Sequence, residues 1–103
     1  MRRLILTFLF LSGFGFGERI LIPMDLAQKD HLKAYGIAYW VLNQEINVEW
    51  LLNFRGGSFM IEHYPSILKE CRVRGVTVEV LSDDAVLANY REIDANNMEV
   101  ILL

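Results

Sequence analysis

The run Arg55-Gly56-Gly57-Ser58 contains the residue types best suited to binding an anion. Arginine can bind a carboxylate or phosphate through two parallel hydrogen bonds, and glycines let backbone N–H groups approach a negative charge closely. The run lacks the GxGxxG spacing of dinucleotide-binding loops, and no helix is predicted directly after it. A flexible turn with a solvated arginine is the alternative interpretation. We therefore predict a site for a small anionic ligand here, and the residues identify no cofactor.

Asp25, Gln28, Asp30 and His31 form a second group of polar side chains. Carboxylates and imidazoles serve as acid–base catalysts and as metal ligands, but this spacing is not that of a metal-binding motif. A turn aspartate, a helix N-cap at Asp30 and a first-turn histidine would explain the same residues. We include Asp25, Gln28 and His31 in the predicted ligand site and assign no metal.

No nucleophilic residue stands in a catalytic sequence context. Cys71 lies inside a predicted helix, between Glu70 and Arg72, whereas a nucleophile elbow is a glycine-flanked turn between a strand and a helix. Ser58 lacks the second glycine of that pattern, because position 60 is Met60. We interpret Cys71 as a buried thiol and predict no catalytic residue, so the residues leave open whether the protein is an enzyme.

The elements that would position these groups can be read from apolar periodicity and from turn residues. Helical spacing in 31–44 places apolar residues over more than half of the circumference, with Trp40 on the wetter side. The members of that apolar set are Ala34, Tyr35, Ile37, Ala38, Tyr39, Val41 and Leu42. Trp40, Trp50 and the tyrosines are interpreted as core or half-buried aromatics, with a partner surface as the alternative. The predicted strands are 20–22, 48–52, 76–80 and 99–103, the other helices are 65–74 and 85–93, and 58–64 is an ambiguous loop.

Strand–helix–strand spacing over 20–52 is typical of a right-handed crossover between parallel strands. We therefore predict an open, mostly parallel, flavodoxin-like three-layer α/β sheet. In such sheets ligands bind beyond the carboxyl ends of the strands, which here are 23–28, 53–58 and 82–84. With strand order 2-1-3-4, the crevice would lie between the first and third strands. Because the sequence stops on the apolar strand 99–103, we also predict that the sheet is truncated after its fourth strand and belongs to a longer protein.

The N-terminus has the pattern of a secretory signal. Met1-Arg2-Arg3 is followed by an apolar run through Phe16, and Gly15 and Gly17 occupy the small-residue positions before Glu18. The run is shorter than the ~20 residues of a membrane-spanning helix. We predict a signal peptide over 1–17, cleaved near Gly17, and an exported α/β domain over 18–103 in a periplasmic or secreted setting.

Charge and cysteine content exclude several classes of partner. The chain has 10 basic and 13 acidic residues, a formal charge of −3. Removing Arg2 and Arg3 with the signal leaves 8 basic residues against the same 13 acidic ones, or −5. Such a chain is not expected to bind nucleic acid or to insert stably into a membrane. Its single cysteine excludes an internal disulfide.

Two runs carry a family resemblance: IPMDLAQKDHLKAYGIAYWVLNQEINVEWLLNFRGGSF and ECRVRGV. They resemble the opening of a family of exported bacterial proteins generally labelled asparagine synthetase B, from Ile20 to about Val80. The label implies ATP-dependent amide synthesis with glutamine hydrolysis. No catalytic residue is carried over, because Arg2 stands where an asparagine synthetase B has its nucleophilic cysteine.

Three hypotheses about function follow from the sequence. The first is an exported α/β protein that binds a small anionic ligand near Arg55-Gly56-Gly57. The second is a glutamine-hydrolysing, amidotransferase-like enzyme with its active site outside this chain. The third is a non-enzymatic envelope interaction module, with Trp40 among its contacts.

Overall fold

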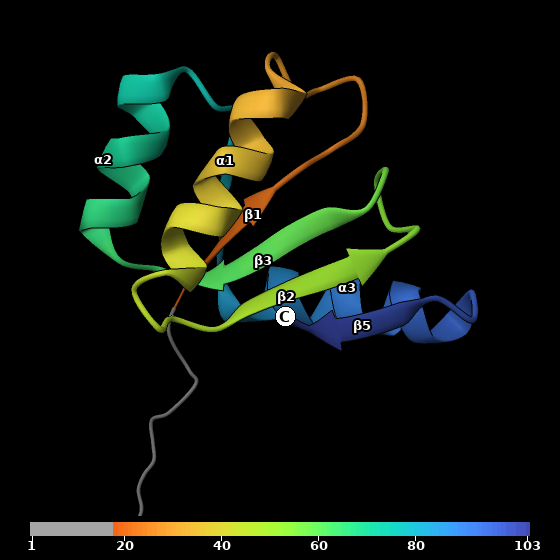
Figure 1. Ribbon diagram of the computed structural model, residues 1–103. Coiled ribbons are helices and arrows are strands. Elements are labelled where there is room, and N and C mark those ends of the chain that lie inside the picture. Colours follow the sequence, from red (N-terminus) through yellow and green to blue (C-terminus); the bar gives the residue numbers. More distant parts are fainter. Residues whose placement is uncertain (1–17) are drawn as a thin grey trace, which may run out of the picture.

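The computed structural model describes residues 18–103, so the predicted signal peptide lies outside the described residues. These residues form five strands and three helices around one sheet (Figure 1). In chain order they are β1 Arg19–Ile22, α1 His31–Leu42, β2 Val48–Leu52, β3 Ser58–Glu62, α2 Pro65–Arg74, β4 Glu79–Leu81, α3 Asp83–Ala95 and β5 Glu99–Leu102.

The sheet has the order β4-β1-β3-β2-β5, and each neighbouring pair is antiparallel. The prediction of an open, mostly parallel, flavodoxin-like sheet truncated after a fourth strand is therefore wrong. The cause is the segment predicted as an ambiguous loop, which contains β3. β3 forms a hairpin with β2 and inserts between β1 and β2, so the two strands joined by α1 run in the same direction without touching.

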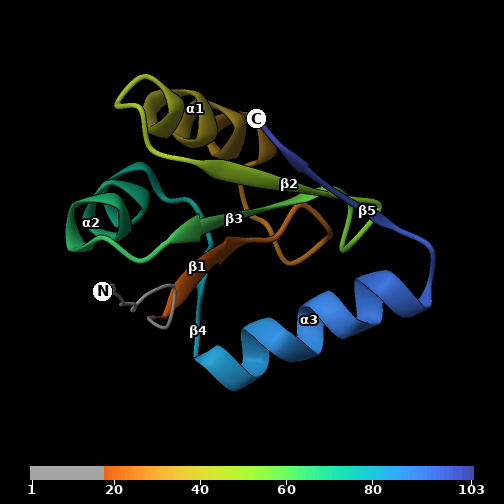
Figure 2. The same ribbon diagram turned by 90° about the horizontal axis from the view of Figure 1, so that it is seen from below.

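The first six elements follow the βαββαβ order of a ferredoxin-like fold, and their strands have its sheet order β4-β1-β3-β2. Helices α1 and α2 lie on one face of this sheet. α3 leaves β4 at one edge, crosses the opposite face, and leads to β5 at the other edge (Figure 2). Both faces of the central strands are thus covered by helices. This is why β1 is apolar on both faces, as a buried parallel strand would be, although the sheet is antiparallel.

Two apolar clusters fill the two faces. The larger lies between the sheet and α1 with α2, and includes Ile20, Ile37, Val41, Ile61 and Cys71. The smaller lies under α3, where Val86 and Ile93 contact Leu21, Leu51 and Met60. Alternation along each strand directs successive side chains to the two clusters.

Local signals set the helix ends: α2 has the predicted bounds, whereas α1 ends two residues earlier than predicted and α3 extends two residues further at each end. The Asp30 side chain accepts a hydrogen bond from the Lys33 backbone N–H, and Ser82 does the same for Ala85. Pro65 begins α2, and Gly75 ends it in a left-handed conformation with φ of 75°. Within residues 18–103, no helix is long and apolar enough to cross a membrane.

Candidate functional site

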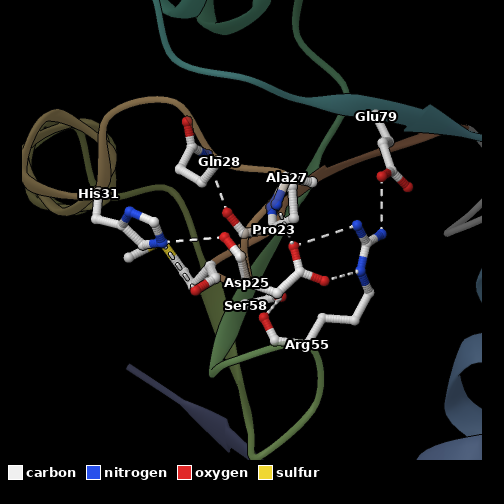
Figure 3. Close-up of polar contacts among 9 residues, drawn as sticks. Pro23, Asp25, Ala27, Gln28, His31, Arg55, Ser58 and Glu79 are labelled. Atoms are coloured by element: carbon white, nitrogen blue, oxygen red, sulfur yellow. Dashed lines mark hydrogen bonds and ion pairs between the residues drawn. The ribbon is translucent and has the colours of Figure 1, made fainter.

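The structure brings the predicted site residues together, although by a different topology from the one expected. Asp25, Gln28 and His31 come from the β1–α1 connection and the start of α1, and Arg55 to Ser58 come from the β2–β3 hairpin (Figure 3). The two segments touch because β1 and β3 are neighbours, and the N–H of Met24 donates to the Arg55 carbonyl at 3.1 Å. We call this group of contacts the loop cluster.

Two carboxylates occupy the Arg55 guanidinium. Arg55 Nε donates to Asp25 Oδ2 at 2.8 Å, and Nη1 donates to Glu79 Oε2 at 2.7 Å. The hydrogen bond from Arg55, followed by one from the Ala27 N–H, lowers the pKa of Asp25. The same two carboxylates, Asp25 foremost, raise the pKa of Arg55. An incoming anion must therefore compete with Asp25 or Glu79 for the guanidinium.

The two glycines of the predicted anion loop have packing roles. Gly56 has φ of 81°, and a Cβ there would lie 2.5 Å from the Met24 carbonyl oxygen. Gly57 has φ of 89°, and its carbonyl accepts a hydrogen bond from Trp50 Nε1 at 3.1 Å. Ser58 is fully buried, and its Oγ donates to the Arg55 carbonyl at 3.0 Å. Close approach of the Met24 backbone thus accounts for Gly56, whereas the Trp50 side chain and a positive φ account for Gly57.

Gln28 joins three parts of the chain. Its Nε2 donates to the carbonyls of Pro23 and Thr77, each at 2.9 Å, and its Oε1 accepts from the Thr77 N–H at 2.8 Å. The side chain is only 5% exposed. A buried amide that exchanges two hydrogen bonds with one distant backbone residue fixes the entry to β4 against the β1–α1 loop.

The His31 side chain also forms hydrogen bonds within the loop cluster. Its Nε2 lies 3.0 Å from the carbonyl oxygens of both Met24 and Asp25, so this nitrogen carries the proton in those contacts. The imidazole therefore closes the β1–α1 loop onto the first turn of α1. In residues 18–103, no group of three or more histidine, cysteine or acidic residues has the geometry to hold a metal ion.

Cys71 is a buried thiol, as its position in the sequence predicts. It is completely buried in the cluster beneath α1 and α2, and burial raises the pKa of its thiol to about 11. A thiol with such a pKa carries almost no thiolate at neutral pH, which disfavours a nucleophilic role.

Three features of this molecule were not predicted from the sequence: the second partner of Arg55, the exposure of two tyrosines and the partial burial of Trp40. Glu79 was assigned only to a strand, yet it completes the pairing of Arg55. Tyr35 and Tyr39 were placed in the apolar set of the helix, yet they are 56% and 68% exposed. Trp40, expected on the wetter side, is half-buried, and the Arg74 guanidinium lies 5.6 Å from its ring centroid. Which side chains of α1 are exposed depends on the packing of α1 against α2. Helical periodicity in the sequence does not reveal that contact.

The fold defines a small α/β protein with an extended ferredoxin-like sheet, and a fold of this kind leaves function open. No protein family model, curated protein or solved structure matched the chain. The resemblance to proteins labelled asparagine synthetase B therefore stays a prediction.

Proposed function

We propose that this protein is a non-enzymatic interaction module that binds an apolar, uncharged surface of another protein through the outer face of α1. The observation that carries the proposal is the α1 stripe, which consists of Leu32, Tyr35 and Tyr39. Their side chains are 81%, 56% and 68% exposed. Positions i, i+3 and i+7 lie on one side of a helix, so the three side chains form a continuous surface.

The stripe differs from an ordinary solvated helix face. From Ala34 to Gln44 the sequence contains no acidic or basic residue, whereas an exposed helix face normally carries charged side chains. Apolar patches of this kind mark contact surfaces, and tyrosine is enriched at the centres of protein interfaces. Lys33 is the single basic residue between Leu32 and Tyr39, and one positive charge disfavours nucleic acid and anionic lipid as the occupant. An uncharged protein surface fits it best.

The stripe is also held rigidly, which lowers the entropy cost of binding. The opposite face of α1 is anchored in the core by Ala34, Ile37 and Val41. The Tyr35 ring makes an edge-to-face contact with Phe59, with ring centroids 5.9 Å apart. The exposed side of that ring is therefore presented in a fixed orientation.

Site-specific photocrosslinking in cells that produce the complete chain tests the proposal. A photoreactive residue at position 39 should give discrete protein adducts. The same residue at Lys69, an exposed position on α2, should not. Tyr35→Asp should abolish the adducts formed from position 39 without changing the far-UV spectrum. If positions 39 and 69 give the same adduct pattern, the α1 stripe is not a docking surface; lipid adducts at position 39 would reject a protein occupant.

Small-anion binding at the loop cluster is a second candidate function. The observation that favours it is that the two predicted segments meet in the loop cluster, where the Arg55 side chain remains 29% exposed. A carboxylate or phosphate ligand would have to replace Asp25 or Glu79 on the guanidinium. Thermal-shift measurements with phosphate and with amino acids test this function, because Arg55→Lys should remove any ligand-induced stabilisation. Equal shifts for both proteins would exclude Arg55 as the ligand contact.

The amidotransferase alternative has a direct test of its own. The family resemblance implies glutamine hydrolysis, and export implies a cleaved N-terminus. Because this alternative places the active site outside this chain, release of ammonia from glutamine by the purified longer protein would support glutamine hydrolysis. The mass of the protein recovered from the periplasm or medium would test cleavage near Gly17. Neither measurement depends on the α1 stripe.

A further inference from the structure

The two edges of the sheet differ in how they are protected from pairing with another strand. β4 has only three residues and carries Glu79, and Ser82 turns the chain into α3 immediately afterwards. Shortness and charge are the usual means by which proteins blunt an edge strand. β5 has four residues, and from Val100 to Leu103 the chain contains neither charge nor proline. β5 lies at the free margin of the sheet beside β2 (Figure 1).

The hydrogen bonding of β5 with β2 determines which backbone groups face that margin. The Leu103 N–H donates to the Val48 carbonyl at 3.0 Å, and Ile101 lies opposite Trp50. Hydrogen-bonded and non-hydrogen-bonded pairs alternate in an antiparallel ladder. Ile101 therefore exchanges its hydrogen bonds with β2, and the N–H and C=O groups of Val100 and Leu102 point away from the sheet.

The side chains of these two residues are exposed as well. Val100 and Leu102 lie on the α3 side of the sheet and are 41% and 62% exposed. Ile101 points to the opposite face, the one covered by α1 and α2, because it is paired with Trp50, which packs against that cluster. From Val100 to Leu102, β5 therefore presents outward-facing backbone groups and exposed apolar side chains, with neither charge nor proline to protect the edge.

We propose that β5 pairs antiparallel with β5 of a second copy of this chain, with Ile101 opposite Ile101 of the second copy. In this register, Val100 of each copy lies opposite Leu102 of the other. The outward-facing backbone groups of both residues are then used, and their exposed side chains contact each other. The pairing is isologous, as in a two-fold dimer, and continues the antiparallel order already present across the sheet.

The position of Glu99 favours the antiparallel arrangement over a parallel one. Glu99 is the one charged residue of β5. The antiparallel register places it opposite Leu103 of the second copy, so the two glutamates lie at opposite ends of the paired strands. A parallel arrangement would bring the two Glu99 carboxylates together, which is unfavourable. A dimer through one short strand falls in the small, weak class of interfaces, so its equilibrium must be followed over a range of concentrations.

Sedimentation velocity of the complete chain, over a concentration series, tests the proposal. The wild type should show a concentration-dependent dimer. Leu102→Pro removes one outward-facing donor without removing a bond to β2, and should weaken the dimer about tenfold or more. Val80→Lys, on the exposed β4 edge, is the matched control and should leave the dimer unchanged.

A pair of double variants tests the register. Val100→Lys with Leu102→Lys places like charges opposite each other and should give monomers. Val100→Glu with Leu102→Lys places opposite charges there and should restore the dimer, which another register would not do. A wild type that stays monomeric, or a dimer that survives the two lysines, would overturn the proposal. Tyr39→Asp separates it from the α1 stripe: loss of the dimer in that variant would assign self-association to α1 instead.

Discussion

Arg55 and Asp25 connect two loops that lie 30 positions apart in the sequence, with Arg55 Nε donating to Asp25 Oδ2 at 2.8 Å. The pair joins the β1–α1 connection to the β2–β3 hairpin, and Glu79 extends it to β4. The residues predicted to bind a ligand thus bind one another. This relationship gives the loop cluster a structural role whether or not a ligand competes for it.

Asp25→Asn should reduce stability at neutral pH but have little effect in acid. The pKa of Asp25 is lowered from its ordinary value of 3.8, chiefly by Arg55. A lowered folded-state pKa contributes stability that is present above the unfolded-state pKa and is lost as pH falls through the folded-state value. Urea unfolding at pH 7 and at a series of pH values below 3.8 should show the variant and wild type converging as the pH falls. Asp94→Asn, which makes the same charge change on the exposed side of α3, is the control.

Gly56→Ala should be much more damaging than Gly75→Ala. Both glycines have positive φ, so each substitution carries a backbone cost of about 1–2 kcal/mol. Only at Gly56 would the new Cβ meet a backbone oxygen, at 2.5 Å from Met24, whereas Gly75 has open space around it. Denaturant unfolding should therefore give a lower free energy of unfolding for Gly56→Ala than for Gly75→Ala. Equal losses for the two would contradict the close approach of the loops.

Gln28→Ala should cost about 2–3 kcal/mol of unfolding free energy. The substitution leaves the part-buried N–H of Thr77 and the buried carbonyl of Pro23 without their side-chain partner. Gln44→Ala is the control, because its amide makes one exposed hydrogen bond to the Trp40 carbonyl. The Gln44 variant should lie within about 0.5 kcal/mol of wild type. Hydrogen exchange should also show faster exchange of the Thr77 amide in Gln28→Ala alone.

Tyr90 connects α3 to the central sheet, and its hydroxyl should ionise late. It donates to the Glu49 carboxylate and accepts from Arg19 Nη1 at 3.1 Å. Burial, followed by the hydrogen bond to Glu49, raises its pKa to about 12. Because the folded-state value is raised, the stabilisation is complete below pH 10 and is lost as pH rises towards 12.

Spectrophotometric titration of the phenols checks this directly. Wild type should show a tyrosine ionising near pH 12 that is missing in Tyr90→Phe. The variant should also be about 1–2 kcal/mol less stable at pH 7, because Glu49 and Arg19 lose a shared partner. A Tyr90 that titrates with the exposed tyrosines would mean that α3 does not hold it against β2.

Features that depend on neighbouring residues in the chain were predicted better than features that depend on tertiary contacts. The N-cap Asp30 and the helix 65–74 were predicted correctly, because capping depends on residues within a few positions of each other. The loop cluster was also anticipated as a group, since both of its segments follow apolar strands. The ion pairs of Arg55 within this cluster were not predicted, because Glu79 comes close to Arg55 only when β4 pairs with β1.

Local pattern in the chain was enough to predict the N-cap of α1, the bounds of α2, most of the strands, the buried state of Cys71 and the two loops that meet. The order of the strands, the exposure of Tyr35 and Tyr39, and the partners of Arg55 depend on contacts between distant parts of the chain. The strand β3 explains why. A short strand that is apolar on both faces has the same pattern in a parallel and an antiparallel sheet, and its neighbours are chosen by contacts between distant parts of the chain.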